Sequence, residues 1–589
     1  MSVRAFPVRG SCSPRRLSAA LVVVLACFSA LGARLVVLQV VEGDSYDLLA
    51  SNQRERAVPF PARRGAIFDR KGNPLAISVD LQTIYADPAL VEDPASEALE
   101  LAEILGHSPV AIEALLRGDP SWSRFEYIAR RVSPRVARAV EGLDLAGVYM
   151  RPEPQRFYPN GGLGAHVLGF VGSEGSGLEG VEAQYEEILK GRAGRMTLEQ
   201  DPSGRPLPQA DLAWRRPDPG RSLYLTIDKD IQFQTELFLE AAAGRYHAQS
   251  GSAVVMDPRT GDILAMAGFP SFDPNRFERY SGNTYRNRAT TDVFEPGSSY
   301  KIVTAAAALE EGLVTPWTRF TVPDELPYQD RIFHDSHYHE TEQMSVSEII
   351  EQSSNVGTIK IGLELGSRRL DRYVRKFGFG SSSGLGFPGE SEGLVLDLDE
   401  WSGTTGATVP IGQGVAVTTV QMAAAYSALA NGGVWLEPRL VSGAAGQDGS
   451  VQRMPTGSRR RIVSSRTARQ MTGMLTRVVK RGTGLEAQVP GYTVAGKTGT
   501  AQKALPEGGY GNSYVSSFAG YAPVEDPAVA VVVILDDPRP IWGGATAAPT
   551  FSAIADFTLR KLGVPPSTNA RRAAAQREAA VEGVEDPHD

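Results

Sequence analysis

Ser298 and Lys301 have the residue types and the spacing for nucleophilic catalysis. They open an apolar stretch, residues 302–309, that predicts a helix, and the i, i+3 spacing puts the hydroxyl and the amine on one face, one turn apart. A serine is a weak nucleophile until a base takes its proton, and a lysine partly desolvated at a helix start can be that base. A Ser-x-x-Lys match is expected about twice by chance in a chain of this size. Taken alone, the pair is better explained by a helix cap followed by a solvated lysine.

Two further polar motifs follow along the chain. Ser353–Asn355 comes after a predicted helix, residues 346–352, and places a hydroxyl and an amide two residues apart; alone, an ordinary polar loop explains it. Lys497–Thr500 lies in an alternating segment, residues 492–501, that predicts a strand in which Gly499 lets another backbone approach closely. Lys-Thr-Gly is expected only about 0.1 times per chain by chance, and no phosphate-binding glycine loop precedes the lysine. This motif is therefore the most informative of the three.

The three motifs in this order resemble those of the penicillin-recognising serine acyltransferases, a group of transpeptidases, carboxypeptidases and serine β-lactamases. The resemblance implies that Lys301, as a neutral amine, accepts the proton of Ser298. Ser298 then attacks the carbonyl between two D-alanines of a stem peptide, and the terminal D-Ala leaves. Ser353 would relay the proton to the leaving amine, and Asn355 would fix Lys301 and the substrate amide.

The resemblance also implies how the substrate is held. The backbone N–H groups of Ser298 and Thr500 would bind the oxyanion. Lys497, Thr498 and Thr500 of the motif around Gly499 would bind the terminal carboxylate. An amine of a neighbouring stem then takes the acyl group and forms a crosslink, whereas β-lactams mimic the D-Ala-D-Ala end and stall at the first step. The chemistry calls for no cofactor and no metal.

The likeness extends over nearly all of residues 34–563, and its membrane-proximal signatures resemble class B penicillin-binding proteins. No glycosyltransferase domain fits before them, so a bifunctional class A enzyme is not expected. The C-terminal segments, with residues 34–40, look most like the division-specific (septal) type, and the rod-elongation type is the alternative. The segments that carry the likeness are Arg64–Ala76, Arg156–Pro159, His166–Gly172, Gly177–Glu182, Tyr514–Pro523, Asp536–Pro538 and Gly543–Pro549.

The sequence departs from the family pattern at one site residue and lacks one element of a hydrolase. Ser299 stands after the nucleophile where Thr is usual, a small change that should not abolish the chemistry. Between Asn355 and Lys497 there is no Glu-x-x-x-Asn match to the deacylating element of class A β-lactamases. Efficient hydrolysis of an acyl-enzyme is therefore not expected.

A dense histidine cluster offers a competing chemistry. His334, His337 and His339 could in principle bind zinc. No step of the implied reaction needs a metal, so we favour a polar loop beside the active-site cleft and predict no metal.

The composition limits the partners. With Lys+Arg 60 against Asp+Glu 68, a net charge of −8 and no basic block, the chain lacks the footprint of a nucleic-acid binder. Its two cysteines, Cys12 and Cys27, both lie at the extreme N-terminus, so the rest of the chain has neither disulfides nor cysteine metal ligands. The protein can therefore work in an oxidising compartment without depending on disulfide bonds.

The N-terminus predicts a single membrane anchor. Residues 1–16 carry four arginines and no acidic residue and form a cytoplasmic tail, and the apolar residues 17–41 then cross the membrane. The apolar character resumes after Arg34, and no clean cleavage site follows it, so a cleaved signal peptide is the weaker alternative. The remaining residues, with the catalytic domain, are expected on the periplasmic or extracytoplasmic side of the inner (cytoplasmic) membrane.

At 589 residues the chain exceeds a single hydrophobic core, and we predict an α+β multidomain fold. Residues 42–221 would form a loop-rich α+β pedestal of the class B (dimerisation) type, ending in a proline-rich boundary around 202–220. Residues 222–563 would form an α/β transpeptidase domain related to serine β-lactamases. Strands at 223–227, 252–257, 263–266 and 528–535 would bracket its helices. Residues 564–589 are expected to be disordered.

The implied partners are stem peptides on lipid-linked or nascent glycan, the membrane, a glycan polymerase of the shape, elongation, division and sporulation family, and other division proteins. Three rival functions remain: a non-catalytic division scaffold, a β-lactam sensor or hydrolase, and a carboxypeptidase. The intact motifs argue against the scaffold. Rapid penicillin turnover would favour the hydrolase, and release of D-Ala without crosslinks would favour the carboxypeptidase.

Overall fold

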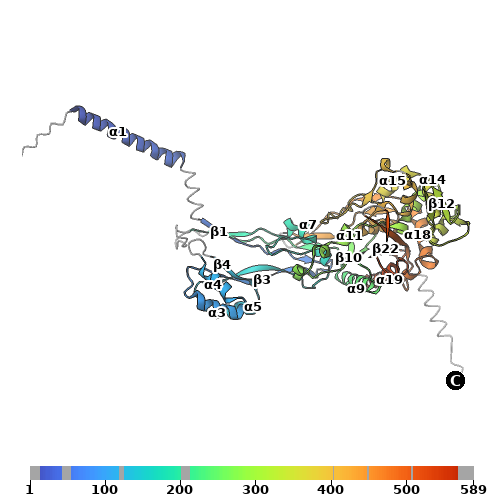
Figure 1. Ribbon diagram of the computed structural model, residues 1–589, viewed down its shortest axis with the longest axis horizontal. Helices are drawn as coiled ribbons and strands as arrows, with labels where there is room; N and C mark the ends of the chain where they lie inside the picture. The colour runs from blue at the N-terminus through green and yellow to red at the C-terminus, as the bar shows by residue number, and fades with distance from the viewer. Residues whose placement is uncertain are drawn as a thin grey trace, which may run out of the picture. The chain divides into compact units, whose positions relative to one another are not determined.

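The computed structural model describes residues 14–42, 55–118, 125–199, 213–401, 403–446, 450–505 and 509–567. The chain divides into two compact units (Figure 1). Unit 1 comprises residues 1–62, 81–153 and 192–218, and unit 2 comprises 63–80, 154–191 and 219–589. Most of the predicted disordered tail (568–589 of 564–589), residues 1–13 of the predicted cytoplasmic tail and the proline-rich segment 202–208 lie outside the described residues. The first residues of the 564–589 tail are described, and the Ser567 N–H donates to the carbonyl of Gly491 at 2.8 Å.

A five-stranded antiparallel sheet in unit 2 carries one of the three chemistry-bearing motifs. Its order is β10-β9-β23-β22-β21, so strands from both ends of the predicted domain pair in its middle, as predicted. The edge strand β21 contains the Lys497–Thr500 motif and begins at Ala495, three residues later than the alternation at 492 suggested. The strands are β9 (Ser250–Met256), β10 (Ile263–Phe269), β21 (Ala495–Ala504), β22 (Tyr510–Ala522) and β23 (Val529–Asp536).

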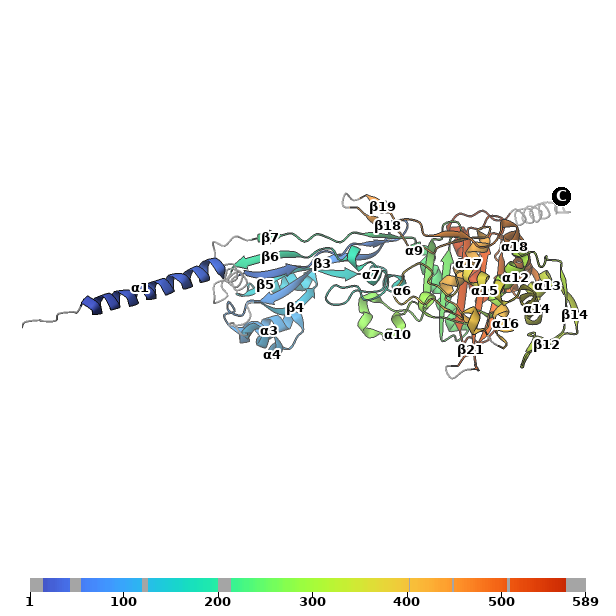
Figure 2. The same cartoon turned by 90° about the horizontal axis from the view of Figure 1, so that it is seen from above.

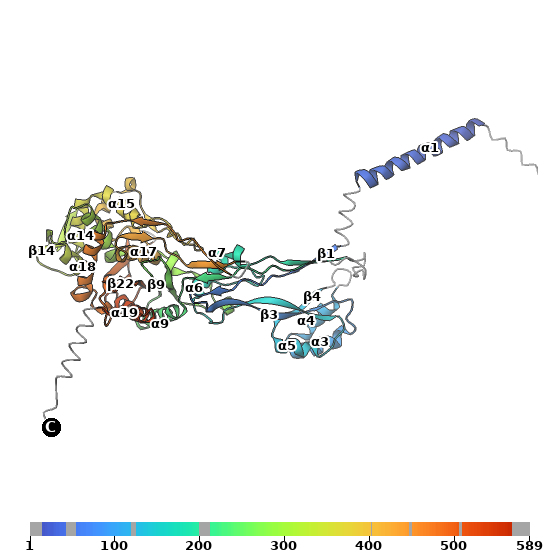
Figure 3. The same cartoon turned by 180° about the vertical axis from the view of Figure 1, so that it is seen from behind.

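Helices cover both faces of this sheet, because its strands are apolar on both sides. Along β23, Val531 and Val533 belong to one hydrophobic cluster, and Val532 between them belongs to another. One cluster includes α9 (Lys229–Arg245) and α19 (Ala547–Lys561), and the other includes α12 (Lys301–Glu310) and α17 (Thr419–Ala430). Figures 1 and 3 show α9 and α19 together on one side of β22, and Figure 2 gives the view from above, in which α17 lies over the strands.

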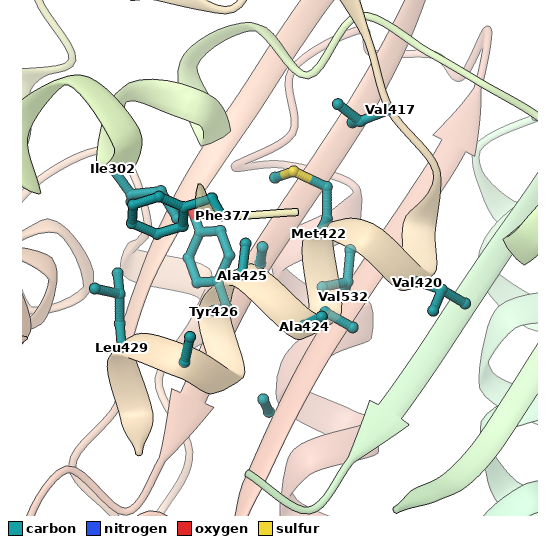
Figure 4. Close-up of a cluster of buried hydrophobic side chains, with 14 of the residues drawn as sticks. Ile302, Phe377, Val417, Val420, Met422, Ala424, Ala425, Tyr426, Leu429 and Val532 are labelled. Atoms are coloured by element: carbon teal, nitrogen blue, oxygen red, sulfur yellow. The ribbon is translucent and has the colours of Figure 1, made fainter. Parts of the chain in front are cut away.

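The buried helix α17 connects the core to the site. Apolar side chains surround it on all sides, among them Ile302, Phe377 and Val532 (Figure 4). Thr418 and Gln421 form its capping box, which satisfies free N–H groups at its buried start. The Tyr426 hydroxyl donates to the carbonyl of Ser299, 2.7 Å away. The core therefore holds the backbone next to Ser298 directly.

The predicted local elements around the motifs are confirmed. β8 (Leu223–Leu225) precedes Asp228, whose carboxylate caps α9 by accepting from the second and third N–H groups. The helix expected at 346–352 is α13 (Val346–Gln352). The other elements of unit 2 after residue 219 are η2 (Pro274–Arg279), α10 (Gly282–Tyr285), α11 (Arg288–Thr291), η3 (Gly297–Tyr300), β11 (Arg319–Val322), β12 (Glu325–Tyr328), β13 (Arg331–His334), β14 (Glu342–Ser345), α14 (Asn355–Leu365), α15 (Ser367–Lys376), β15 (Leu394–Val395), η4 (Leu398–Glu400), α16 (Thr405–Thr408), η5 (Val409–Ile411), β16 (Val415–Ala416), β17 (Val434–Leu436), β18 (Val441–Ala445), β19 (Val451–Arg453), β20 (Arg459–Arg461), α18 (Ser465–Arg481) and η6 (Leu485–Ala487).

Unit 1 has its own small core. Ile84, Ile128 and Val140 belong to a cluster between strand residues and three short helices, each of which ends in glycine. Its elements are β1 (Glu55–Phe60), α3 (Pro94–Leu105), α4 (Pro109–Arg117), β4 (Glu126–Val132), α5 (Pro134–Glu141), β6 (Gly194–Glu199) and β7 (Ala213–Arg215); β3 (Pro74–Ala86) and β5 (Val148–Phe157) begin in one unit and end in the other.

The N-terminal segment is helical. α1 (Pro14–Val36) continues into a π-helix, η1 (Val37–Val41), so the helix contains the predicted anchor. Over the described part of the chain, this 28-residue stretch is the one helix long and apolar enough to cross a membrane, with a mean hydropathy of 2.5.

Two segments that the sequence assigned to the pedestal, 63–80 and 154–191, pack within unit 2. A buried ion cluster joins them: Glu182, fully buried, accepts from Arg64 at 2.5 Å and from Arg156 at 2.6 Å. Glu186 pairs with Arg64 as well, also at 2.5 Å. The short elements here are β2 (Ile67–Phe68), α6 (Ala165–Leu168), α7 (Gly180–Gln184) and α8 (Glu186–Leu189). The pedestal boundary at 221/222 stays a prediction.

Glu182→Gln is expected to destabilise unit 2 by about 3–5 kcal/mol, because the substitution leaves the buried guanidinium of Arg156 without its anion and that of Arg64 with Glu186 alone. Urea unfolding followed by tryptophan fluorescence measures the change. Glu187→Gln, which neutralises an exposed neighbour, serves as the control and should change stability by less than about 0.5 kcal/mol. Equal effects of the two substitutions would contradict a structural role for the buried cluster.

Candidate active site

Three elements bring the sequence motifs together. Ser298 lies in η3, immediately before Lys301 opens α12, and in 3₁₀ geometry side chains at i and i+3 eclipse each other. Ser353 and Asn355 lie at the joint between α13 and α14. Lys497 lies on β21, and its amine reaches the hydroxyl of Ser353 at 2.9 Å.

Lys301 is the centre of the hydrogen-bond network. Its amine donates to the Ser353 carbonyl at 2.6 Å and to the Asn355 side-chain oxygen at 2.8 Å, and it lies 3.4 Å from the Ser353 hydroxyl. The residue is fully buried. Burial lowers the pKa of Lys301 to about 7, and the Asp335 carboxylate partly opposes that fall. A large neutral fraction is therefore present near pH 7.

The two lysines of the site share one serine. Lys497 is also fully buried, and burial, followed by the neighbouring Lys301, holds the pKa of Lys497 well below its usual value. Two cations next to each other in a low dielectric repel strongly, so at most one amine carries a proton readily. The Ser353 hydroxyl accepts from Lys497 and keeps its own proton available to donate.

Backbone geometry aims the Ser353 carbonyl into the site. Ser353 has φ +66°, in the left-handed region, where it ends α13. Ser354 then caps α14 by accepting from the Gly357 N–H at 2.8 Å. The left-handed conformation of Ser353 and the cap at Ser354 therefore separate α13 from α14 at this point of the chain.

Gly499 allows the edge strand to lie against the segment that contains Ser298, and the close approach predicted from the sequence is confirmed. A Cβ at this position would lie 2.2 Å from the Ser517 hydroxyl and 2.8 Å from the Pro296 carbonyl. Ser299, the residue that departs from the family pattern, donates its hydroxyl to the same carbonyl at 2.7 Å. Either Ser or Thr at position 299 can supply the hydroxyl for this contact.

Gly499→Ala is expected to lower the rate of penicillin acylation at least about 10-fold, because the added methyl group pushes β21 away from η3. Stopped-flow quenching with a fluorescent penicillin measures the rate. Gly473→Ala on α18, where a Cβ meets nothing within 4 Å, is the control and should keep full activity. An unchanged rate in Gly499→Ala would show that the close approach is dispensable.

The hydroxyls of the Lys497–Thr500 motif are held from outside the motif. Thr498 shares a hydrogen bond of 2.7 Å with Thr483, and the N–H of Gly543 donates to the Thr500 hydroxyl at 3.1 Å. Sequence reasoning missed Thr483, because a single threonine after a helix carries no signal. In the described part of the chain the Ser298 hydroxyl makes no hydrogen bond, and it is half-buried.

The three histidines have different partners. His339 bonds the Asp335 carboxylate at 3.1 Å, and the His337 ring lies 6.0 Å from that of Trp542. His334 lies instead beside Asp324 and Glu325, with ligand atoms within 4.8 Å of one another. The histidines therefore do not form one common ligand set.

Comparison with known proteins identifies both regions. Residues 251–556 match the family model described as the penicillin binding protein transpeptidase domain, and residues 59–225 match the penicillin-binding protein dimerisation domain. Stage V sporulation protein D of Bacillus subtilis is 33% identical over 94% of this chain and 87% of its own length. Peptidoglycan D,D-transpeptidase FtsI of Escherichia coli is 33% identical over 92% of this chain and 91% of its own.

The fold agrees with solved structures of similar proteins. The crystal structure of penicillin binding protein 3 from Mycobacterium tuberculosis, complexed with aztreonam, superposes with a TM-score of 0.69. The two sequences are 32% identical, and the match covers 87% of this chain and 98% of the chain in the crystal structure.

Proposed function

Because this chain belongs to the class B penicillin-binding proteins of the division type, we propose that its three motifs carry the acyl transfer of a peptidoglycan D,D-transpeptidase. The chain is a penicillin-binding transpeptidase. The proposal assigns roles to individual residues. Ser298 is the nucleophile, Lys301 the base, and Ser353 the relay between the two lysines.

The donor count at Lys301 supports its role as base. A neutral amine has two N–H donors and one lone pair. The Ser353 carbonyl and the Asn355 side-chain oxygen can only accept, and each takes an N–H, so the lone pair is left to accept a hydroxyl proton. Ser298 lies one helical turn before Lys301, and the Ser353 hydroxyl, 3.4 Å from the amine, is already bound by Lys497. This arrangement of acceptors around a buried lysine is the observation that carries the proposal.

The first half-reaction is an acylation in which protons balance. The lone pair of Lys301 takes the Ser298 proton as the hydroxyl oxygen bonds to the D-Ala carbonyl carbon. The backbone N–H groups of Ser298 and Thr500 bind the oxyanion that forms. Ser353 donates its proton to the departing D-Ala amine and is reprotonated from the lysine pair. An amine of a second stem peptide then attacks the ester, and Ser298 regains its proton.

The edge strand would hold the substrate's terminal carboxylate through Lys497, Thr498 and Thr500. Without a ligand, burial and Lys301 disfavour a charged Lys497. A carboxylate supplies the missing counter-charge and stabilises the ammonium form of Lys497. Because a charged Lys497 further disfavours a charge on Lys301, substrate binding helps to keep the base neutral.

The anchor would place the catalytic unit outside the cytoplasm. The four arginines of residues 1–16 favour a cytoplasmic N-terminus, and the apolar helix that follows can span the membrane. External protease should then digest unit 2 in spheroplasts and leave a cytoplasmic N-terminal tag intact. Protection of unit 2 would reverse the orientation.

The crosslinking would serve the septum, with a membrane glycan polymerase of the shape, elongation, division and sporulation family and other division proteins as partners. The division-type relatives support this role over rod elongation. Cells whose only copy is Ser298→Ala should then grow as filaments. Round, dividing cells would favour the elongation role.

A crosslinking assay tests the activity. The full-length protein in detergent, with a glycan polymerase and lipid-linked pentapeptide substrate, is expected to form dimeric stem peptides and release one D-Ala per crosslink. Penicillin should abolish both products. Release of D-Ala without dimers would identify a carboxypeptidase instead.

A further inference from the structure

Asp335 meets the Ser353–Asn355 motif from outside it. It is the first residue after β13, and its carboxylate points at the N-terminus of α14. One oxygen accepts the backbone N–H of Asn355, in a short contact, and that of Val356 at 3.0 Å. The other accepts the Ser354 hydroxyl at 2.6 Å. The Asp335 side chain is only 7% exposed, so these are buried, charge-assisted hydrogen bonds.

These bonds fix the groups that hold the base. Asn355 is the first residue of α14, and its side-chain oxygen is one of the two acceptors of Lys301. Its amide nitrogen donates at 3.0 Å to the carbonyl of His334, the residue before Asp335. The segment 334–335 therefore binds both the backbone and the side chain of Asn355. A carboxylate at a helix N-terminus also interacts favourably with the helix dipole.

We propose that Asp335 is a positioning residue for acylation, which holds Ser353–Asn355 against Lys301 and supplies the negative charge that offsets the two buried amines. The inference rests on the proposed roles of Lys301 and Asn355. It assigns Asp335 no contact with the reacting atoms.

His339 would orient the carboxylate from the other side. Its Nε2 lies 3.1 Å from Asp335 and its Nδ1 lies 2.7 Å from the carbonyl of Glu340. Both partners can only accept, so the doubly protonated ring is the form that satisfies both contacts. Burial alone would lower the pKa of His339, but the Glu340 carbonyl and the Asp335 carboxylate raise it.

The charges around this pair predict opposite pH effects for two substitutions. Asp335 faces two cations, His339 on its own loop and Lys301 on α12. Lys497 lies next to Lys301 on β21, and Glu342 on β14 also faces His339. Removing the anion lets Lys301 lose its proton at lower pH. Removing the histidine cation strengthens the field of the anion, so Lys301 keeps its proton to higher pH.

Acylation by a fluorescent penicillin, followed by stopped flow between pH 5.5 and 9, tests the inference on the full-length protein in detergent. Asp335→Asn should acylate about 10–100-fold more slowly, and the rising limb of its pH profile should move to lower pH. His339→Gln should lose little rate, and its limb should move to higher pH. Asp330→Asn, which removes the same charge from the turn between β12 and β13, should match the wild type.

A purely structural cap would slow acylation without moving the limb, and that result would overturn the inference, as would a wild-type rate in Asp335→Asn. If Asp335→Asn does not fold, Ser354→Ala and His339→Gln each remove one partner and carry the test. Their melting temperatures should stay near that of the wild type while their rates or limbs change; unchanged rates and limbs in both would contradict the inference. Failure of the wild type itself to acylate would instead contradict the proposed function.

Discussion

Ser298→Ala protein incubated with penicillin is expected to keep its intact mass, whereas the wild-type protein gains the mass of one penicillin molecule. The substitution removes the hydroxyl one helical turn before Lys301, which is the proposed nucleophile, whereas the other hydroxyl near this amine, that of Ser353, already accepts from Lys497. The acylation rate should fall by at least about 10⁴-fold, the usual cost of deleting a nucleophile that acts as a unit with its base. Mass spectrometry of the intact protein measures the adduct.

The adduct of the wild type should also persist. The chain lacks the Glu-x-x-x-Asn element that class A β-lactamases use for deacylation, so water attacks the ester slowly. Ser552→Ala on α19, which covers the opposite face of the sheet, is the matched control and should form the full adduct. Rapid release of hydrolysed penicillin would identify a hydrolase, and a full adduct in Ser298→Ala would remove the nucleophile from its proposed role.

The linear motifs predicted which side chains the fold brings together, because each motif is short and has a distinctive composition. Ser298 and Lys301 lie one turn apart, and the close approach at Gly499 is confirmed. The local elements were also predictable. Asp228 caps α9 and the apolar run 528–535 is a buried strand, since both depend on neighbours within a few residues.

Contacts between distant parts of the chain were not predictable. Asp335 binds Ser354 and Asn355 across 19 and 20 residues, and polar loop composition gives no sign of that pairing. The same holds for the segments 63–80 and 154–191, which pack in unit 2 through contacts such as Gly65 N–H to the carbonyl of Leu189. Sequence periodicity reports which side of an element is buried, and it does not report which partner covers it.

The rate of penicillin acylation is expected to rise with pH through about pH 7 and to level off above it. Lys301 must be neutral to take the Ser298 proton, and burial lowers the pKa of Lys301 to about 7. Below that pH the amine is protonated, its lone pair is occupied and the rate falls tenfold per pH unit. An ordinary lysine would place the same limb near pH 10.

Lys301→Gln should abolish this limb and slow acylation by about 10³-fold, because an amide can still donate to Ser353 and Asn355 but cannot accept the proton. Stopped-flow acylation across the pH range measures both effects. Lys360→Gln on α14, whose amine donates to the carbonyl of Thr321 outside the site, should keep the wild-type profile. A wild-type limb near pH 10, or a limb near pH 7 that survives in Lys301→Gln, would assign the proton to another group. If both results hold, the buried lysine with its two fixed acceptors is the general base, and the low dielectric of the site is what makes it one at neutral pH.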